Sequence, residues 1–98
     1  MTTAEEKFNR LAAQWSEETQ FLSSSTKIAA HPAYQEIVGM GHTAVVFMLR
    51  RLAAGELEHW FTALHLITRI DPVPPADRGR IARMAEHWVE WGRNRRII

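Results

Sequence analysis

Glu56 and His59 stand out among the acidic and histidine residues that could act as metal ligands in this chain. Their E-x-x-H spacing would place a carboxylate and an imidazole on one face of a helix. A helical di-iron centre needs two such pairs, together with carboxylates from two further helices. The sequence holds no second pair, because His87 and Glu90 occur in the reverse order. We therefore predict no metal ligands and no cofactor, and interpret Glu56 as an acidic residue in the first turn of a helix.

The remaining candidates for catalysis lack the neighbours that catalysis requires. A general base needs a group that positions it, and the sequence shows none beside any histidine. His31 precedes Pro32 and His42 lies at the expected start of a helix, so we expect both to contact backbone or water. Ser23–Ser25 lacks the glycines of a nucleophile elbow and is interpreted as part of an interhelical loop. We accordingly name no catalytic residue and predict that the chain is not an enzyme.

The four tryptophans carry the most information about binding. Trp15, Trp60 and Trp88 fall in apolar helical stripes, which predicts core or half-core positions. Trp91 lies one turn beyond Trp88, close to three arginines, and tryptophan with arginine is the usual composition of an interface hot spot. Filling of the core explains these aromatic residues equally well. Our candidate partner-binding residues are Trp88, Trp91, Arg93, Arg95 and Arg96.

Length and composition indicate one globular domain over residues 1–98. Apolar residues make up 46% of the chain and charged residues 23%, as in ordinary globular proteins. The formal net charge of +1 is too small to indicate a nucleic-acid or membrane partner. There is no cysteine, and no apolar run approaches the roughly 20 residues of a membrane span. With a start that does not read as a signal peptide, these features predict a cytoplasmic protein.

The hydrophobic periodicity predicts helices throughout and no strand. Thr3 and Glu6 form a capping-box pattern, Gly55 follows a basic helix end, and the prolines of Asp71–Pro75 form a stiff connector. The segment before Gly55 is apolar nearly all round, so we place it in the middle of the structure. The two C-terminal isoleucines either fold back onto the body or belong to a contact. We predict five helices, at residues 4–22, 33–38 (after a short helical stretch at 27–30), 42–54, 56–70, and from 75 or 76 to about 92.

Residues 37–70 are similar to one unit of the HEAT-repeat class. Gly41 precedes a segment rich in alanine and valine, and Ala63–Leu64 with Ile67 matches the second helix of such a unit. The resemblance covers about a third of the chain and implies a central HEAT-like α–α hairpin. Because a single unit cannot bury its own faces, the flanking helices would have to cap it.

Most of residues 15–93 resembles a family of small, uncharacterised bacterial proteins. The matching segments include His31–Gln35, Ile37–Gly41, His59–Trp60, Asp71–Pro75 and Glu90–Gly92. The resemblance names no functional residue. It implies a bacterial origin and a gene that lies beside a second small gene, as in antitoxin–toxin pairs.

The sequence thus predicts an all-α bundle and three functions in order of preference. The first is a non-enzymatic protein-interaction module, antitoxin-like or regulatory, whose partner is the product of a neighbouring gene. The second is a nucleic-acid-binding accessory protein that uses the arginines of the last helix, and the third is a metal-dependent helical-bundle enzyme. Homodimerisation stays open, because so apolar a helix at residues 42–54 leaves surface that a short chain does not fully cover.

Overall fold

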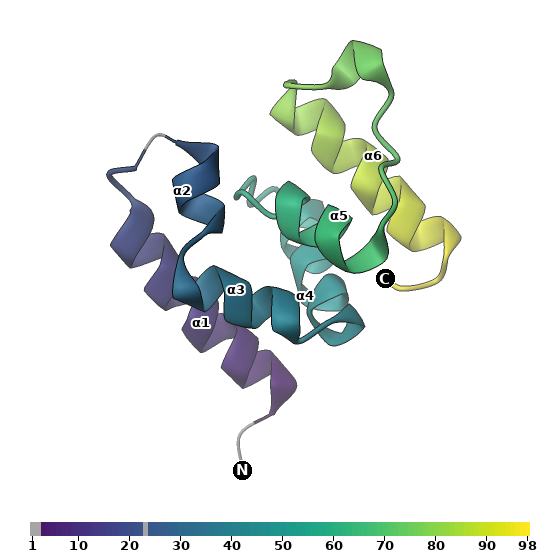
Figure 1. Ribbon diagram of the computed structural model, residues 1–98. Coiled ribbons are helices and arrows are strands. Elements are labelled where there is room, and N and C mark those ends of the chain that lie inside the picture. The colour runs from purple at the N-terminus through teal and green to yellow at the C-terminus, as the bar shows by residue number, and fades with distance from the viewer. Residues whose placement is uncertain (1–2, 23) are drawn as a thin grey trace.

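Every regular element in residues 3–22 and 24–98, the part that the computed structural model describes, is a helix (Figure 1). The predicted all-α class is confirmed. The short helical stretch predicted at residues 27–30 is a separate helix in the structure, α2, with the bounds Ser25–Ala29. Within the described residues the elements are α1 (Ala4–Thr19), α2 (Ser25–Ala29), α3 (Pro32–Gly39), α4 (His42–Ala53), α5 (Phe61–Thr68), the 3₁₀ turn η1 (Pro75–Asp77) and α6 (Ile81–Asn94).

The first three helices begin at side chains that cap them. The predicted capping box is confirmed: Thr3 Oγ1 accepts from the Glu6 N–H at 3.1 Å, and the Thr3 N–H donates to Glu6 Oε2 at 3.3 Å. Ser24 caps α2, so the predicted loop at residues 23–26 ends earlier than expected; residue 23 lies outside the described residues. His31 caps α3, and its Nδ1 accepts from the Ala33 N–H at 3.1 Å.

Three predicted helix boundaries are wrong, each for a local reason. The first helix ends at Thr19 instead of residue 22, where the Thr19 hydroxyl donates to the Trp15 carbonyl and competes with the helical hydrogen bonds. The fourth predicted helix starts at Phe61 instead of residue 56, because the chain reverses at Gly55 (φ +87°). The last helix starts at Ile81, because η1 ends at Asp77 and a second positive-φ glycine, Gly79, follows it.

The ends of the last two helices also differ from the prediction. Arg69 takes a left-handed conformation (φ 61°), which ends α5 at Thr68 instead of residue 70. Gly92 does not end α6, which continues to Asn94; this glycine instead lies where α6 approaches α4 closely. A Cβ atom on Gly92 would lie 2.7 Å from Cδ1 of Leu49.

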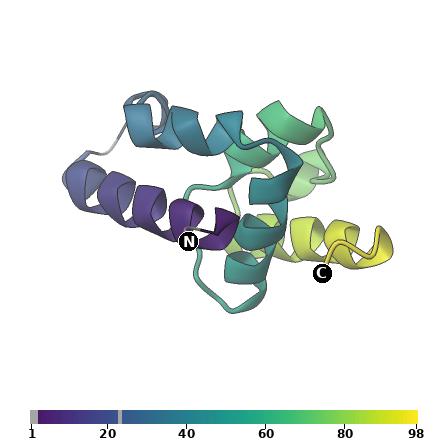
Figure 2. The same cartoon turned by 90° about the horizontal axis from the view of Figure 1, so that it is seen from below.

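The apolar α4 lies in the middle of the structure, as predicted, and packs against α1, α5 and α6 (Figure 2). On its α1 side is an aromatic cluster, in which the Trp60 ring lies 4.8 Å from Trp15, 5.4 Å from Phe8 and 6.0 Å from Tyr34 between ring centres. On its other side, α6 packs mainly on α4. The helices are thus arranged as α1, α2, α3 and α5 on one flank of α4 and α6 on the other.

The chain end folds back onto the body, which was one of the two predicted outcomes. Arg96 is left-handed (φ 57°), the Ile97 N–H donates to the Gly92 carbonyl at 2.8 Å and the Arg96 N–H donates to the Arg93 carbonyl at 3.0 Å. This is the hydrogen-bond pattern of a Schellman motif. It directs Ile97 and Ile98 against the core. Among the residues that the structure describes, no helix combines the length and the hydropathy needed to cross a membrane.

Candidate functional site

The structure separates the five predicted partner-binding residues. Trp88 is only 2% exposed and belongs to the core, so its side chain is not available at the surface. Its ring meets that of Trp91 edge-on at 5.5 Å, and Trp91 is partly buried. The Arg95 guanidinium lies 5.6 Å from the centre of the Trp91 ring. Trp88, Trp91 and Arg95 therefore form one stack that runs from the core to the surface.

Arg93 and Arg96 lie outside that stack. Both are exposed, and Arg96 occupies the left-handed position that ends α6. Arg93 lies two residues from both Trp91 and Arg95, which places it on another side of the helix. There it lines a groove between α6 and the C-terminal end of α4. The predicted site is thus two features, of which the groove offers the larger surface.

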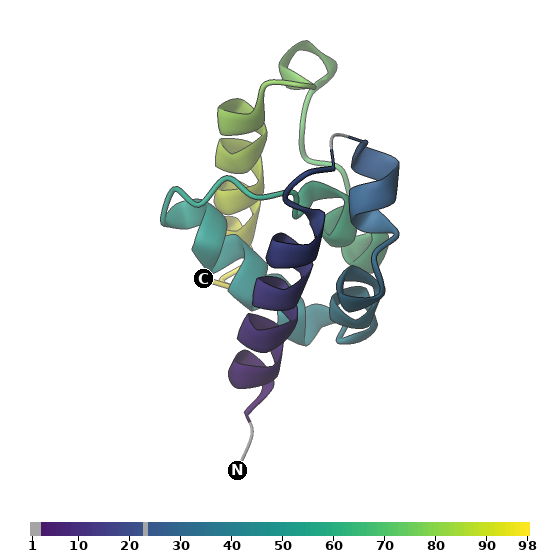
Figure 3. The same ribbon diagram turned by 90° about the vertical axis from the view of Figure 1, so that its left-hand side faces the viewer.

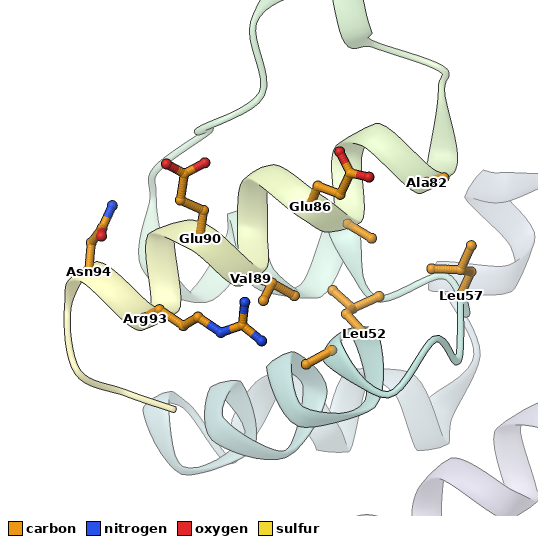
Figure 4. A pocket seen from close by; sticks show the side chains of 10 residues that line it. Leu52, Leu57, Ala82, Glu86, Val89, Glu90, Arg93 and Asn94 are labelled. Carbon is orange, nitrogen blue, oxygen red and sulfur yellow. The ribbon is translucent and has the colours of Figure 1, made fainter.

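The groove along α6 has a volume of about 580 Å³, which is within the range of ligand-binding clefts (Figure 4). Leu52 and Val89 form a buried apolar floor, and Leu57, which is 45% exposed, lies at the end where α6 begins. Glu86 and Glu90 project from the outer side of α6, away from the floor, whereas Arg93 extends across it. The residues that line it are Leu52, Ala53, Leu57, Ala82, Ala85, Glu86, Val89, Glu90, Arg93 and Asn94.

The groove exists because α4 stops before it has covered α6. At the end of α4 the Gly55 N–H donates to the Leu52 carbonyl at 3.1 Å, and the Glu56 N–H donates to the Arg51 carbonyl at 3.0 Å. This Schellman motif turns the chain away and leaves the next residues without helical structure. Arg51 then holds this connection in place through a hydrogen-bonded ion pair with Glu58 at 3.1 Å. The apolar face of α6 therefore runs past the end of α4 and stays partly open.

The charges around the groove are arranged asymmetrically. Glu86 pairs with Arg83 at 3.3 Å, and both side chains are exposed. Glu90 and Arg93 are one helical turn apart, yet the structure shows no ion pair between them or from either to another described residue. Figure 4 shows the reason, because the Glu90 side chain points outward and Arg93 points over the groove. The groove consequently combines an apolar floor with one cation that has no carboxylate partner among the described residues.

The structure separates Glu56 and His59 from any helix and gives His31 a capping role. Glu56 and His59 lie in the connection between α4 and α5, so the expectation that they share a helix face is wrong. His31 Nε2 lies 3.2 Å from Glu18 Oε1, and its capping role confirms the predicted backbone contact. Within the part of the chain that the structure describes, no three histidine or acidic side chains gather as a metal site would require.

A second histidine joins η1 to α6. His87 Nε2 lies 2.7 Å from Asp77 Oδ2. This hydrogen bond, with the nearby charges of His87, Arg83 and Arg80, holds the pKa of Asp77 below its usual value against the opposing effect of desolvation. An imidazole and a carboxylate in this arrangement could position each other, but residues 69–98 contain no serine, threonine or cysteine. We therefore interpret the pair as a link that fixes the start of α6.

Comparison of the chain with family models, with curated proteins and with solved structures finds no significant match. The two resemblances inferred from the sequence, to a HEAT unit and to a family of small bacterial proteins, accordingly stay predictions.

Sequence reasoning misses most of the groove. The apolar pattern places Leu57 on the face of a helix that does not exist at that position, and Leu52 and Val89 read as ordinary core residues. The sequence signal that could have revealed the groove is Gly55 followed by acidic residues. This pattern is typical of a helix end, but it occurs both where a non-helical connection follows and where a second helix begins directly. Of the residues that line the groove, Arg93 alone belongs to the predicted partner-binding set.

Proposed function

We propose that this chain is a non-enzymatic protein-interaction module that binds another protein with the groove along α6. The observation that carries the proposal is an apolar groove of about 580 Å³ with charged side chains at its edges. Interfaces of this kind accept an amphipathic helix, whose apolar side chains enter the groove. Leu57 would be the apolar anchor at one end, because nearly half of its side chain is exposed without a partner.

A stable complex would have to cover the groove and part of the surface around it. A standard interface takes about 800 Å² from each partner, which is about an eighth of the 6156 Å² surface of this chain. On the other side of Leu57 is a second hollow of about 280 Å³, which Leu22 at the end of α1 also lines. Figure 3 shows the α4–α5 connection, which carries Leu57, crossing between α6 and the end of α1. Leu57 lines both hollows, so a partner that covers this side chain in the groove could also contact the second hollow.

The resemblance to small bacterial proteins suggests which partner to test. It implies a second small gene beside this one, so the partner would be the product of that gene, with this chain as its antitoxin-like or regulatory counterpart. The stack of Trp91 and Arg95 would lie near the edge of such an interface and contribute less than the groove.

The test is co-expression with the neighbouring gene product, followed by light scattering to measure the mass of the purified species. We expect a stable complex that Leu57→Glu abolishes. Leu66→Glu is the matched control, because Leu66 is similarly exposed (38% against 45%) but lies on α5, outside the groove. Equal loss with both variants, or a mass equal to that of the chain alone, would contradict the proposal.

Nucleic-acid binding is the alternative that the same material can test. If the chain binds nucleic acid through Arg93, Arg95 and Arg96, affinity falls steeply with salt, and replacing all three by alanine lowers the slope by about one for each phosphate that the variant no longer binds. Under our proposal we expect no salt-dependent binding of duplex DNA or RNA beyond that of the triple variant.

A further inference from the structure

The Arg93 side chain indicates what kind of segment the groove accepts. Arg93 crosses an apolar floor with no carboxylate partner among the described residues, although Glu90 is only one turn away. A guanidinium binds a carboxylate with two parallel hydrogen bonds, and such a pair gains strength where water is excluded. An apolar segment that fills the groove would exclude water from just this place. The groove therefore complements a segment that carries both apolar side chains and a carboxylate.

The position of Arg93 also sets the order of those side chains. The groove extends along α6 from Ala82 and Leu57 at one end to Arg93 and Asn94 at the other. Twelve residue steps of helix cover about 18 Å, so a partner helix of about three turns matches its length. Its apolar side chains would lie over Leu52, Val89 and Leu57, with the acidic residue at the Arg93 end.

We infer that the groove binds a short amphipathic helix of a partner protein, in which an aliphatic stripe ends in an aspartate or glutamate that pairs with Arg93. The inference rests on the proposed function and specifies the chemistry of the partner. Glu86 and Glu90 point away from the groove floor, so Arg93 is the charge that sets the acidic residue of the partner and the direction of the partner helix along α6.

The experiment uses two synthetic peptides that share one leucine stripe at helical spacing. One ends its stripe in glutamate and the other ends it in lysine, and binding to the full chain is measured by fluorescence anisotropy of a labelled peptide. We expect the glutamate peptide to bind about fivefold more tightly than the lysine peptide, which corresponds to about 1 kcal/mol for a well-formed ion pair at a partly exposed site. Arg93→Gln should remove this difference, whereas Arg10→Gln, a control at an exposed arginine on α1 outside the groove, should keep it.

The variants distinguish failure of this inference from failure of the proposed function. If Leu57→Glu abolishes binding of both peptides while Arg93→Gln changes neither, the groove binds protein but the carboxylate match is overturned. If Arg10→Gln lowers affinity as much as Arg93→Gln, a general attraction to the basic side chains of the protein replaces the specific pair and the inference also fails. If neither peptide binds and co-expression yields no complex, both proposals fail. A homodimer that Leu57→Glu dissociates would overturn the inference by identifying a second copy as the occupant.

Discussion

The hydroxyl of Tyr34 caps a helix that its own sequence leaves uncapped, and its removal should weaken the fold measurably. Trp60 precedes α5 and offers no side-chain cap. Tyr34, from α3, accepts from the Ala63 N–H at 2.8 Å and donates to the His59 carbonyl at 2.8 Å. Both Tyr34 and Ala63 have no exposed surface. The hydroxyl therefore does for α5 what a serine or threonine does for other helices.

The cost of Tyr34→Phe follows from these contacts. His59 is exposed, so water can replace the hydroxyl at its carbonyl, whereas the buried Ala63 N–H has no access to water. Removal of a hydrogen bond costs about 1 kcal/mol, and a buried donor left unsatisfied costs about 1–3 kcal/mol. We expect Tyr34→Phe to lower the free energy of unfolding by about 2–3 kcal/mol, measured by urea unfolding followed by tryptophan fluorescence. A decrease below about 0.5 kcal/mol with an unchanged m value would refute the reasoning.

Alkaline titration gives a second, independent readout of the same hydroxyl. Burial raises the pKa of Tyr34 to about 12, so its stabilising effect is fully present below the unfolded pKa of 10 and is lost as the pH rises from 10 to 12. The full shift corresponds to about 3 kcal/mol. Because the chain has one tyrosine, the ultraviolet absorbance of tyrosinate reports Tyr34 alone. Tyrosinate that appears near pH 10 while the protein is still folded would contradict this prediction.

Three further predictions concern the packing of α6 and the connection before α5. Gly92→Val should destabilise the protein by about 1–3 kcal/mol through overpacking against Leu49, and a double-mutant cycle with Leu49→Ala should show that the two changes are not additive. His87→Gln should destabilise the protein at neutral pH, and the difference from wild type should shrink as the pH falls below about 4, because the lowered pKa of Asp77 contributes stability only above that range. Arg51→Met should lower the free energy of unfolding by about 1–2 kcal/mol, measured by urea unfolding. It removes the hydrogen bonds of the guanidinium and its cation–π contact, 5.1 Å from the centre of the Phe8 ring. An unchanged unfolding midpoint would show that neither contact stabilises the fold.

The sequence predicted the helices whose ends are marked by strong local signals. The capping box at Thr3, the glycine after Ala54 and the apolar segment of α4 all led to correct elements, because each depends on residues within one or two turns. Most of the boundary errors have local causes, such as the Thr19 hydroxyl and the positive φ of Gly55 and Gly79, but the start of α5 also depends on a distant contact. Tyr34 fixes the start of α5 from 29 residues away, and no pattern near Ala63 reveals that hydroxyl.

The candidate site was predictable only in part, for a related reason. The cluster of Trp91 and the arginines was visible in the sequence, but its division between two sides of α6 depends on how that helix is turned against α4. Gly92 determines that orientation through its close approach to Leu49, and a glycine near a helix end more often indicates that the helix stops. The groove itself depends on the non-helical connection between α4 and α5, which the predicted helix start at residue 56 conceals.

The attachment of α6 mainly to one neighbour, α4, has a consequence for how binding and folding are linked. Because α6 packs mainly on α4 and follows the proline-rich segment 71–75, it can open as a cooperative unit while the aromatic cluster on the other side of α4 stays intact. The groove exists only while α6 is docked. Any occupant therefore shifts the opening equilibrium by mass action and protects the amides of α6 from hydrogen exchange more than those of α1 or α3. In a cell the state of the last helix would then depend on whether the groove is occupied, because a chain without its partner would expose α6 to proteolysis before the other helices.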